Sequence, residues 1–159
     1  MEPPAVPPSD ALRFSARVHT RWSDEDNQSV LNNAVYLTLL EEGRHAYFTR
    51  LDLLDMNRFS FLLAQTNVRF LSPGRGGVDA TLEMSTVHLG NSSFRQAYRV
   101  RGPGGTTWCE AEALLVSWEP TTGASRPMPA SFRATIAAFE GLNDSLNDGS
   151  CAPPPGRAG

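Results

Sequence analysis

The feature that most limits the fold is a long helical pattern at residues 34–51, because it is apolar around more than half of its circumference. Its apolar residues follow helical spacings and are Val35, Leu39, Leu40, Ala46, Tyr47 and Leu51. Asn32 or Asn33 can cap the first turn. A helix this apolar is usually covered by a sheet or by a partner. The rest of the chain is therefore expected to wrap around it.

The stretch before this helix has the alternation of a half-buried strand. Positively charged side chains occupy one face, at Arg13, Arg17, His19 and Arg21. The apolar face is expected to hold Leu12, Phe14, Ala16, Val18 and Trp22. The sequence therefore predicts a strand that directs this second set into the core.

Four strand-like stretches follow the helix, and each ends at a Gly or Pro turn signal. They span residues 61–71, 78–89, 93–101 and 106–119. Consecutive strands with short connections favour an antiparallel meander, and residues 130–139 read as a short amphipathic helix. The order predicts an α+β fold in which an antiparallel sheet wraps around one long central helix.

The two ends of the chain differ in composition from the middle. Residues 2–10 contain four prolines, and residues 141–159 are mainly small and polar. Neither segment buries enough apolar surface to offset the entropy of ordering it. We therefore expect a disordered segment at 1–11, one domain at 12–139 and a disordered tail at 140–159, which suits a chain of 159 residues that is 40% hydrophobic.

Charge and targeting signals narrow the classes of function. The formal charge is −3, which does not favour nucleic acid or an anionic membrane as a partner. All fourteen basic residues are arginine, so lysine chemistry is excluded. The N-terminus lacks a basic region followed by an apolar run, and no stretch reaches the roughly 18 apolar residues of a membrane span. Cys109 and Cys151 do not form a disulfide framework. A cytoplasmic protein is expected.

The densest polar run lies at residues 21–33, between the first strand and the helix. A helix N-terminus presents free backbone N–H groups and a partial positive charge, which suit an oxyanion. A carboxylate in the preceding loop can lie beside that position. Together these groups supply what acyl-transfer hydrolysis requires, namely a base or nucleophile and a place for developing negative charge.

This run also resembles the first-strand motif of the 4-hydroxybenzoyl-CoA thioesterase-like hotdog proteins, approximately Arg-Trp-x-Asp-x-Asp-x-x-Gly-His-Val-Asn-Asn-x-x-Tyr. The matching residues are Arg21, Trp22, Asp24, Asp26, Asn32, Asn33 and Tyr36. Further matches along the chain are Glu42 and Arg44, the stretch 68–70, Pro73, Gly77 and the stretch 89–94. The resemblance covers about residues 12–139, and its order and spacing make chance improbable.

The resemblance implies a hotdog-fold acyl-CoA thioesterase. It also implies a homodimer joined edge to edge, with the active site at the subunit interface and the option of a dimer of dimers. Asp26 aligns with the catalytic aspartate, which acts as nucleophile through a mixed anhydride or as general base on water. The oxyanion donor aligns with the backbone N–H of Asn33. The sequence departs from the family at Asn27, and Ser29 and Val30 replace a Gly-His pair.

Several other residues are candidates for supporting roles. Tyr36 is expected at the acyl pocket, Ser29 among the substrate-binding residues, Ser92 beside the pantetheine and Arg95 at the CoA phosphates. Glu42 is the reserve catalytic carboxylate, with an ordinary surface position as its other reading. The three histidines, at 19, 45 and 88, lack metal-ligand spacing, so no metal is expected. No cofactor is expected beyond the coenzyme A of the substrate.

Two alternatives remain beside hydrolysis of an acyl-CoA or acyl-carrier thioester. The change at Ser29 and Val30 suggests a non-catalytic hotdog module that binds an acyl thioester or only dimerises. A hotdog dehydratase would need a positioned histidine, and the loop contains none. Neither the acyl group nor the choice between CoA and a carrier protein follows from the sequence.

Overall fold

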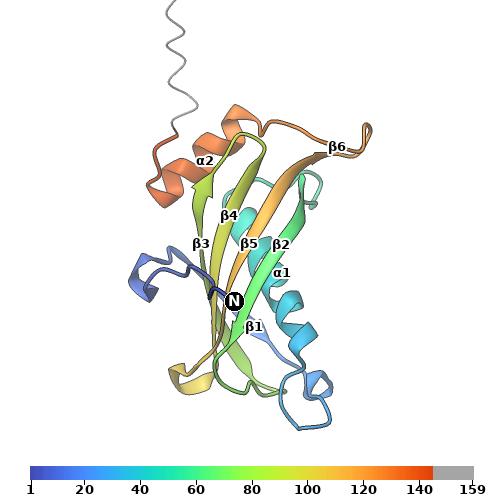
Figure 1. The fold of residues 1–159 in the computed structure, drawn as a ribbon, viewed down its shortest axis with the longest axis vertical. Helices are drawn as coiled ribbons and strands as arrows, with labels where there is room; N and C mark the ends of the chain where they lie inside the picture. The colour runs from blue at the N-terminus through green and yellow to red at the C-terminus, as the bar shows by residue number, and fades with distance from the viewer. Residues whose placement is uncertain (145–159) are drawn as a thin grey trace, which may run out of the picture.

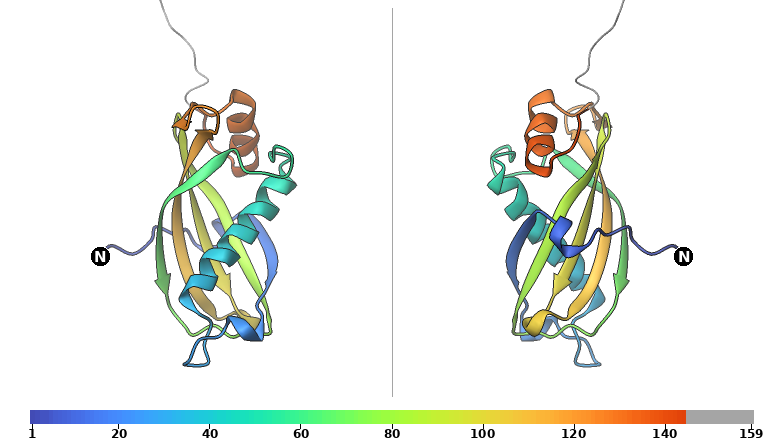
Figure 2. Two further views of the ribbon diagram at one scale, coloured as in Figure 1. Left: turned by 90° about the vertical axis from the view of Figure 1, so that its right-hand side faces the viewer. Right: turned by 90° about the vertical axis from the view of Figure 1, so that its left-hand side faces the viewer.

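A curved antiparallel sheet wraps around one long helix, as the side views in Figure 2 show. The computed structural model describes residues 1–144. The elements labelled in Figure 1 are β1 (Phe14–His19), α1 (Asn33–Arg50), β2 (Phe61–Phe70), β3 (Asp79–Leu89), β4 (Ser93–Arg101), β5 (Thr107–Glu119), β6 (Ala124–Ser125) and α2 (Ala130–Glu140). Three short 3-10 helices complete the set, namely η1 (Ser9–Ala11), η2 (Trp22–Asp24) and η3 (Pro103–Gly105). The predicted α+β hotdog architecture is confirmed.

The strand order in the sheet is β1-β3-β4-β5-β2, with β6 paired to β5. The expected meander is therefore right for β3, β4 and β5 but wrong for β2, which pairs with β5 from Phe61 beside Ser117 to Phe70 beside Cys109. The connection at residues 71–78 carries the chain from one side of the sheet toward the other. Local sequence does not specify such a long-range choice of partner. As a result β2 forms an open edge.

Helix α1 packs one face into the concave side of the sheet. The buried residues on that face include Tyr36, Leu39, Leu40, Tyr47 and Phe48. Gly43 lies on the same face, and a Cβ atom there would come within 2.4 Å of a methyl carbon of Leu82 on β3. Glycine therefore allows the close approach of helix and sheet that the wrapped architecture needs. None of the helices in residues 1–144 has the length and apolar character that crossing a membrane requires.

Trp22 does not lie on the buried face of the first strand, and this expectation is wrong. Strand β1 ends at His19, and the chain turns into η2, where Trp22 is 82% exposed. The alternation continues only as far as Thr20, which is completely buried and donates from its hydroxyl to the carbonyl oxygen of Arg75 at 2.8 Å. Once the backbone leaves the strand conformation, every second residue no longer points the same way.

A chain of buried polar side chains runs through the core beneath α2. The Oε1 atom of Glu140 accepts from the hydroxyl of Tyr47 and from the backbone N–H of Thr86, both at 2.7 Å. The chain continues through Thr86, Gln96 and Tyr98 and ends at the guanidinium of Arg44. Burial raises the pKa of Tyr98 to about 12. Each link supplies a partner that a buried polar group needs.

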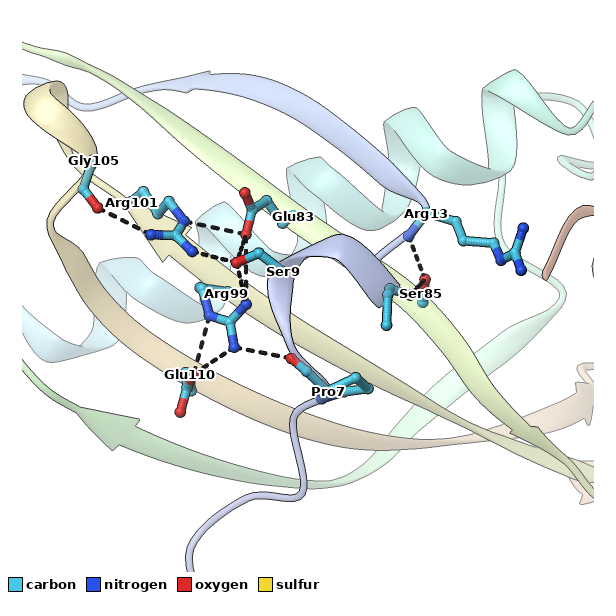
Figure 3. Close-up of polar contacts among 10 residues, drawn as sticks. Pro7, Ser9, Arg13, Glu83, Ser85, Arg99, Arg101, Gly105 and Glu110 are labelled. Atoms are coloured by element: carbon cyan, nitrogen blue, oxygen red, sulfur yellow. Dashed lines mark hydrogen bonds and ion pairs between the residues drawn. The ribbon is translucent and has the colours of Figure 1, made fainter.

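The first twelve residues, here called the N-terminal arm, lie across the outer face of the sheet, opposite α1 (Figures 2 and 3). The segment 1–11, for which we expect disorder, makes defined hydrogen bonds to the strands. The division into 1–11, 12–139 and 140–159 stays a prediction. Most of the expected tail, 145–159, lies outside the described residues.

Candidate functional site

The loop between η2 and α1 is fixed by hydrogen bonds of its own backbone. The N–H of Asp26 donates to the carbonyl of Val30 at 2.8 Å, and the N–H of Asn32 donates to that of Asp24 at 2.9 Å. Ser29 turns the chain with φ of +57°. That left-handed conformation suits glycine, the residue of the family motif at this position. The change to serine therefore keeps the turn, and Asp26 is held beside the start of α1.

Asp24 is a structural residue of this loop. One carboxylate oxygen accepts from the backbone N–H of Arg21 at 2.8 Å, and the other accepts from the Arg21 guanidinium at 3.1 Å. The backbone N–H of Arg21, with help from its side chain, holds the pKa of Asp24 below its usual value. Both oxygens are therefore occupied by groups that fix the entrance to the loop.

The carboxylate of Asp26 is less occupied than that of Asp24. Its side chain is half-buried, and its Oδ1 accepts from the backbone N–H of Gln28 at 2.8 Å. Its Oδ2 accepts no hydrogen bond from any group in the described part of the chain. One carboxylate oxygen is therefore oriented by the loop while the other is available to a ligand or a water molecule.

Within residues 1–144, the first turn of α1 leaves the backbone N–H of Asn33 without an acceptor. Asn32 caps the helix, since its side chain accepts from the N–H of Ala34 at 2.9 Å, as predicted. The N–H of Val35 donates to the carbonyl of Asn32 at 2.9 Å. Within residues 1–144 the N–H of Asn33 has no such partner. This N–H lies at the positive end of the helix dipole, so it can stabilise an oxyanion.

A pocket of about 270 Å³ is lined in part by Asn33. The residues around it are Val30, Leu31, Asn33, Tyr36, Phe70, Leu71, Ser72, Pro73 and Gly74. The rings of Tyr36 and Phe70 meet edge to face at 5.1 Å, and burial raises the pKa of Tyr36 to about 12. A Cβ atom at Gly74 would come within 2.5 Å of the Tyr36 hydroxyl. The pocket is mostly apolar, as an acyl group requires.

The segment 72–77 forms the other wall of the pocket and is tied to the loop. The N–H of Leu31 donates to the carbonyl of Gly74 at 3.1 Å, and the N–H of Gly76 donates to the carboxylate of Glu25 at 2.9 Å. Arg75 donates to the carbonyl of Ser29 at 3.0 Å. The sequence does not predict the role of Glu25 or the pocket wall, because nothing in the local pattern shows that these segments meet.

The structure brings together four of the predicted site residues and separates three others. Asp26, Ser29, Asn33 and Tyr36 belong to the loop and the first turn of α1. The turn that contains Ser92 lies at the opposite end of the sheet (Figure 1), and Arg95 lies on the outer face, 3.2 Å from Glu112. Glu42 lines a separate pocket of about 450 Å³ with His19 and Arg21, among others.

Two further expectations concern metals and cysteine. Residues 1–144 contain no cluster of three or more His, Cys, Asp or Glu side chains that could hold a metal ion. Cys109 is completely buried, and burial raises the pKa of its thiol to about 12. A thiol with so high a pKa is a poor nucleophile at neutral pH, so Cys109 acts as a small buried hydrophobe.

Comparisons with known proteins agree with the fold described above. The family model described as the thioesterase superfamily matches residues 28–109, more than half of the chain. A comparison with curated proteins gives no match. One similar structure is a thioesterase from Thermus thermophilus complexed with coenzyme A and zinc. It is 32% identical, and the match covers 84% of this chain and 99% of the other with a TM-score of 0.74.

Two further structures are similar. A putative thioesterase from Pseudomonas aeruginosa is 29% identical over 79% of this chain and 99% of its own, with a TM-score of 0.70. A 1,4-dihydroxy-2-naphthoyl-CoA thioesterase from Synechocystis is 15% identical over 78% and 95%, also with a TM-score of 0.70, and supports the fold alone. The chain therefore belongs to the thioesterase superfamily, and the predictions of a hotdog fold and of a thioester hydrolase are confirmed.

Proposed function

We propose that the protein hydrolyses an acyl-CoA or acyl-carrier thioester, with the carboxylate of Asp26 and the backbone N–H of Asn33 as its reaction centre. The observation that carries the proposal is the N–H of Asn33, which has no acceptor in residues 1–144 and belongs to a residue that lines a mostly apolar pocket. Asp26, with one carboxylate oxygen available, lies in the loop that leads directly into this helix.

The proposed chemistry follows from these two groups. The thioester carbonyl oxygen accepts a hydrogen bond from the N–H of Asn33, which stabilises the negative charge that develops there. In one route Asp26 attacks the carbonyl carbon, the C–S bond breaks and the thiolate takes a proton from solvent. Water then hydrolyses the mixed anhydride. In the other route Asp26 takes a proton from a water molecule that attacks the carbonyl carbon directly, after which the C–S bond breaks and the leaving thiolate receives that proton. Both routes yield a free acid and a thiol.

The pocket beside Tyr36 is proposed to receive the acyl group. Its walls are largely side chains of aliphatic and aromatic residues, and Gly74 allows the backbone of the wall to pack closely against the Tyr36 hydroxyl. The similar Thermus thermophilus structure contains coenzyme A, which supports CoA as the thiol of the substrate. The reaction as proposed requires no cofactor or metal, because this chain supplies both the carboxylate and the oxyanion donor.

The active form is proposed to be a homodimer joined through β2. This strand is an edge of the sheet and has unpaired backbone groups on its outer side. Of the eight large hydrophobic residues that are exposed within residues 1–144, four lie on β2 or immediately after it, namely Leu62, Leu63, Phe70 and Leu71. Antiparallel pairing with β2 of a second copy would satisfy the backbone groups and cover these side chains. Phe70 also lines the pocket, so the second copy would border the site.

A panel of acyl-CoAs tests the proposal. We expect the wild-type protein to release CoA from at least one short, medium, long or aromatic acyl-CoA, measured with a thiol-trapping dye. We expect Asp26→Asn to lower kcat about a hundredfold or more with an unchanged circular dichroism spectrum. A wild-type protein that binds these thioesters but releases no CoA is a binding module, and the proposal is then wrong.

A further inference from the structure

We propose that the N-terminal arm is a second contact between two copies of the chain, and that the tips of the two arms meet over the seam formed by β2. This inference rests on the edge-to-edge pair proposed above. The arm ends on the strand that would form the seam, and it does so on the face opposite α1.

The base of the arm is anchored on the outer face of β3 and β4 (Figure 3). The guanidinium of Arg99 is buried and donates to the carbonyl of Pro7 at 2.9 Å and to the hydroxyl of Ser9 at 2.6 Å. Ser9 also donates to Glu83 at 3.2 Å. Glu110 balances the charge of Arg99 at 2.8 Å. Charged groups that are buried and fully bonded hold a segment firmly.

From this anchor the arm crosses the remaining strands to the edge of the sheet. The N–H of Ala5 donates to Glu112 on β5 at 3.3 Å, and the side chain of Asn67 on β2 donates to the carbonyl of Glu2 at 3.2 Å. The prolines restrict the arm to extended conformations and lower the entropy lost when it is ordered. The arm therefore reaches β2 as a stiff segment.

The tip of the arm lies near the middle of β2. Residues 1–4 and 67–69 line a groove of about 400 Å³. Met1 is fully exposed, and the N-terminus projects from the outer face in Figure 2. In an antiparallel pair centred on β2, the two copies of Asn67 would be roughly 10–12 Å apart, given about 4.8 Å between strands and about 3.3 Å per residue. Both tips would then lie on one face, on either side of the seam.

Chemical crosslinking tests whether the tips meet. Glu2→Cys is made in a Cys151→Ser background, with the buried Cys109 retained, and treated with a short, flexible bis-maleimide. We expect a covalent dimer at high yield. Asp10→Cys in the same background is the matched control, because it lies at the base of the arm, and we expect little dimer from it.

Sedimentation of the same samples makes each result decisive. If the protein sediments as a dimer but position 2 does not crosslink, the inference is overturned while the edge-to-edge dimer stands. If the protein sediments as a monomer, both the edge-to-edge dimer and the inference are overturned. The thioesterase assay is a separate measurement, so neither result bears on the proposed chemistry.

A deletion measures how much the tips of the arms contribute to the stability of the dimer. Removal of residues 2–5 leaves Pro7 and Ser9 on their anchor, so the sheet is expected to stay folded by circular dichroism. We expect the dissociation constant of the dimer to rise about tenfold or more, which corresponds to one or a few well-placed contacts. An unchanged dissociation constant would contradict a contact between the arms.

Discussion

Two carboxylates lie near the two ends of α1 and have opposite environments. Glu140 is buried, and one of its oxygens accepts from Tyr47 and Thr86, at the end of a polar chain through the core. Asp26 is half-buried, and one of its oxygens is left without a donor in residues 1–144. A carboxylate that satisfies buried donors stabilises the fold. A carboxylate with an oxygen that has no donor is available to a ligand or a water molecule.

The largest effect on stability is expected from Glu140→Leu. The substitution leaves the Tyr47 hydroxyl and the Thr86 N–H buried without an acceptor, at a cost of about 3 kcal/mol in the free energy of unfolding. Chemical denaturation measures this change. We expect kcat of the folded variant to stay within about threefold of the wild type. Glu140→Gln keeps an acceptor oxygen and is the control, with a smaller loss of stability.

A smaller effect is expected from Asp24→Asn, which weakens the bonds to Arg21 and lowers the free energy of unfolding by about 1–2 kcal/mol. Because folding lowers the pKa of Asp24 below 3.8, its ionised form stabilises the fold above that pH. This contribution disappears as the pH falls through the lower pKa of the folded state. The Tm difference between wild type and variant should therefore be constant near pH 7 and shrink below about pH 4. A difference that grows toward acid pH would contradict this role.

The smallest effect is expected from Asn32→Ala, which removes the helix cap and costs about 1 kcal/mol. Asn33→Ala is its control, because the side chain of Asn33 does not cap the helix.

The same Asn33→Ala variant also serves in a separate test of catalysis. The proposed role of Asn33 uses the backbone N–H, so truncation of its side chain should leave kcat nearly unchanged. Asn33→Pro removes that N–H at a helix position that tolerates proline, and we expect a large loss of kcat. Equal activity in both Asn33 variants would exclude the oxyanion role.

The parts of the fold that the sequence predicts are those governed by local chemistry. The cap at Asn32 follows from a side chain that bonds to nearby backbone, and the limits of β3 and β4 follow from strand-like stretches that end at turn signals. The resemblance to a family then places Asp26 and Asn33 in one loop and helix turn.

The parts that the sequence does not predict depend on which distant segments meet. Pairing of β2 with β5 and the contact of Gly74 with Tyr36 arise only after the sheet has curved around α1. The arm is the clearest case. Its composition indicates disorder, because the pattern of apolar residues does not show that a buried Arg99 would bind its carbonyl and hydroxyl groups.

The most direct test of the proposed reaction centre compares Asp26→Asn with Glu42→Gln in one thioesterase assay. Both substitutions remove one negative charge, but only Asp26 belongs to the loop that leads into the free N–H of Asn33. We expect Asp26→Asn to lose about a hundredfold or more in kcat and Glu42→Gln to stay within about threefold. A large loss in Glu42→Gln with an active Asp26→Asn would move the reaction to the other pocket and contradict the proposed centre.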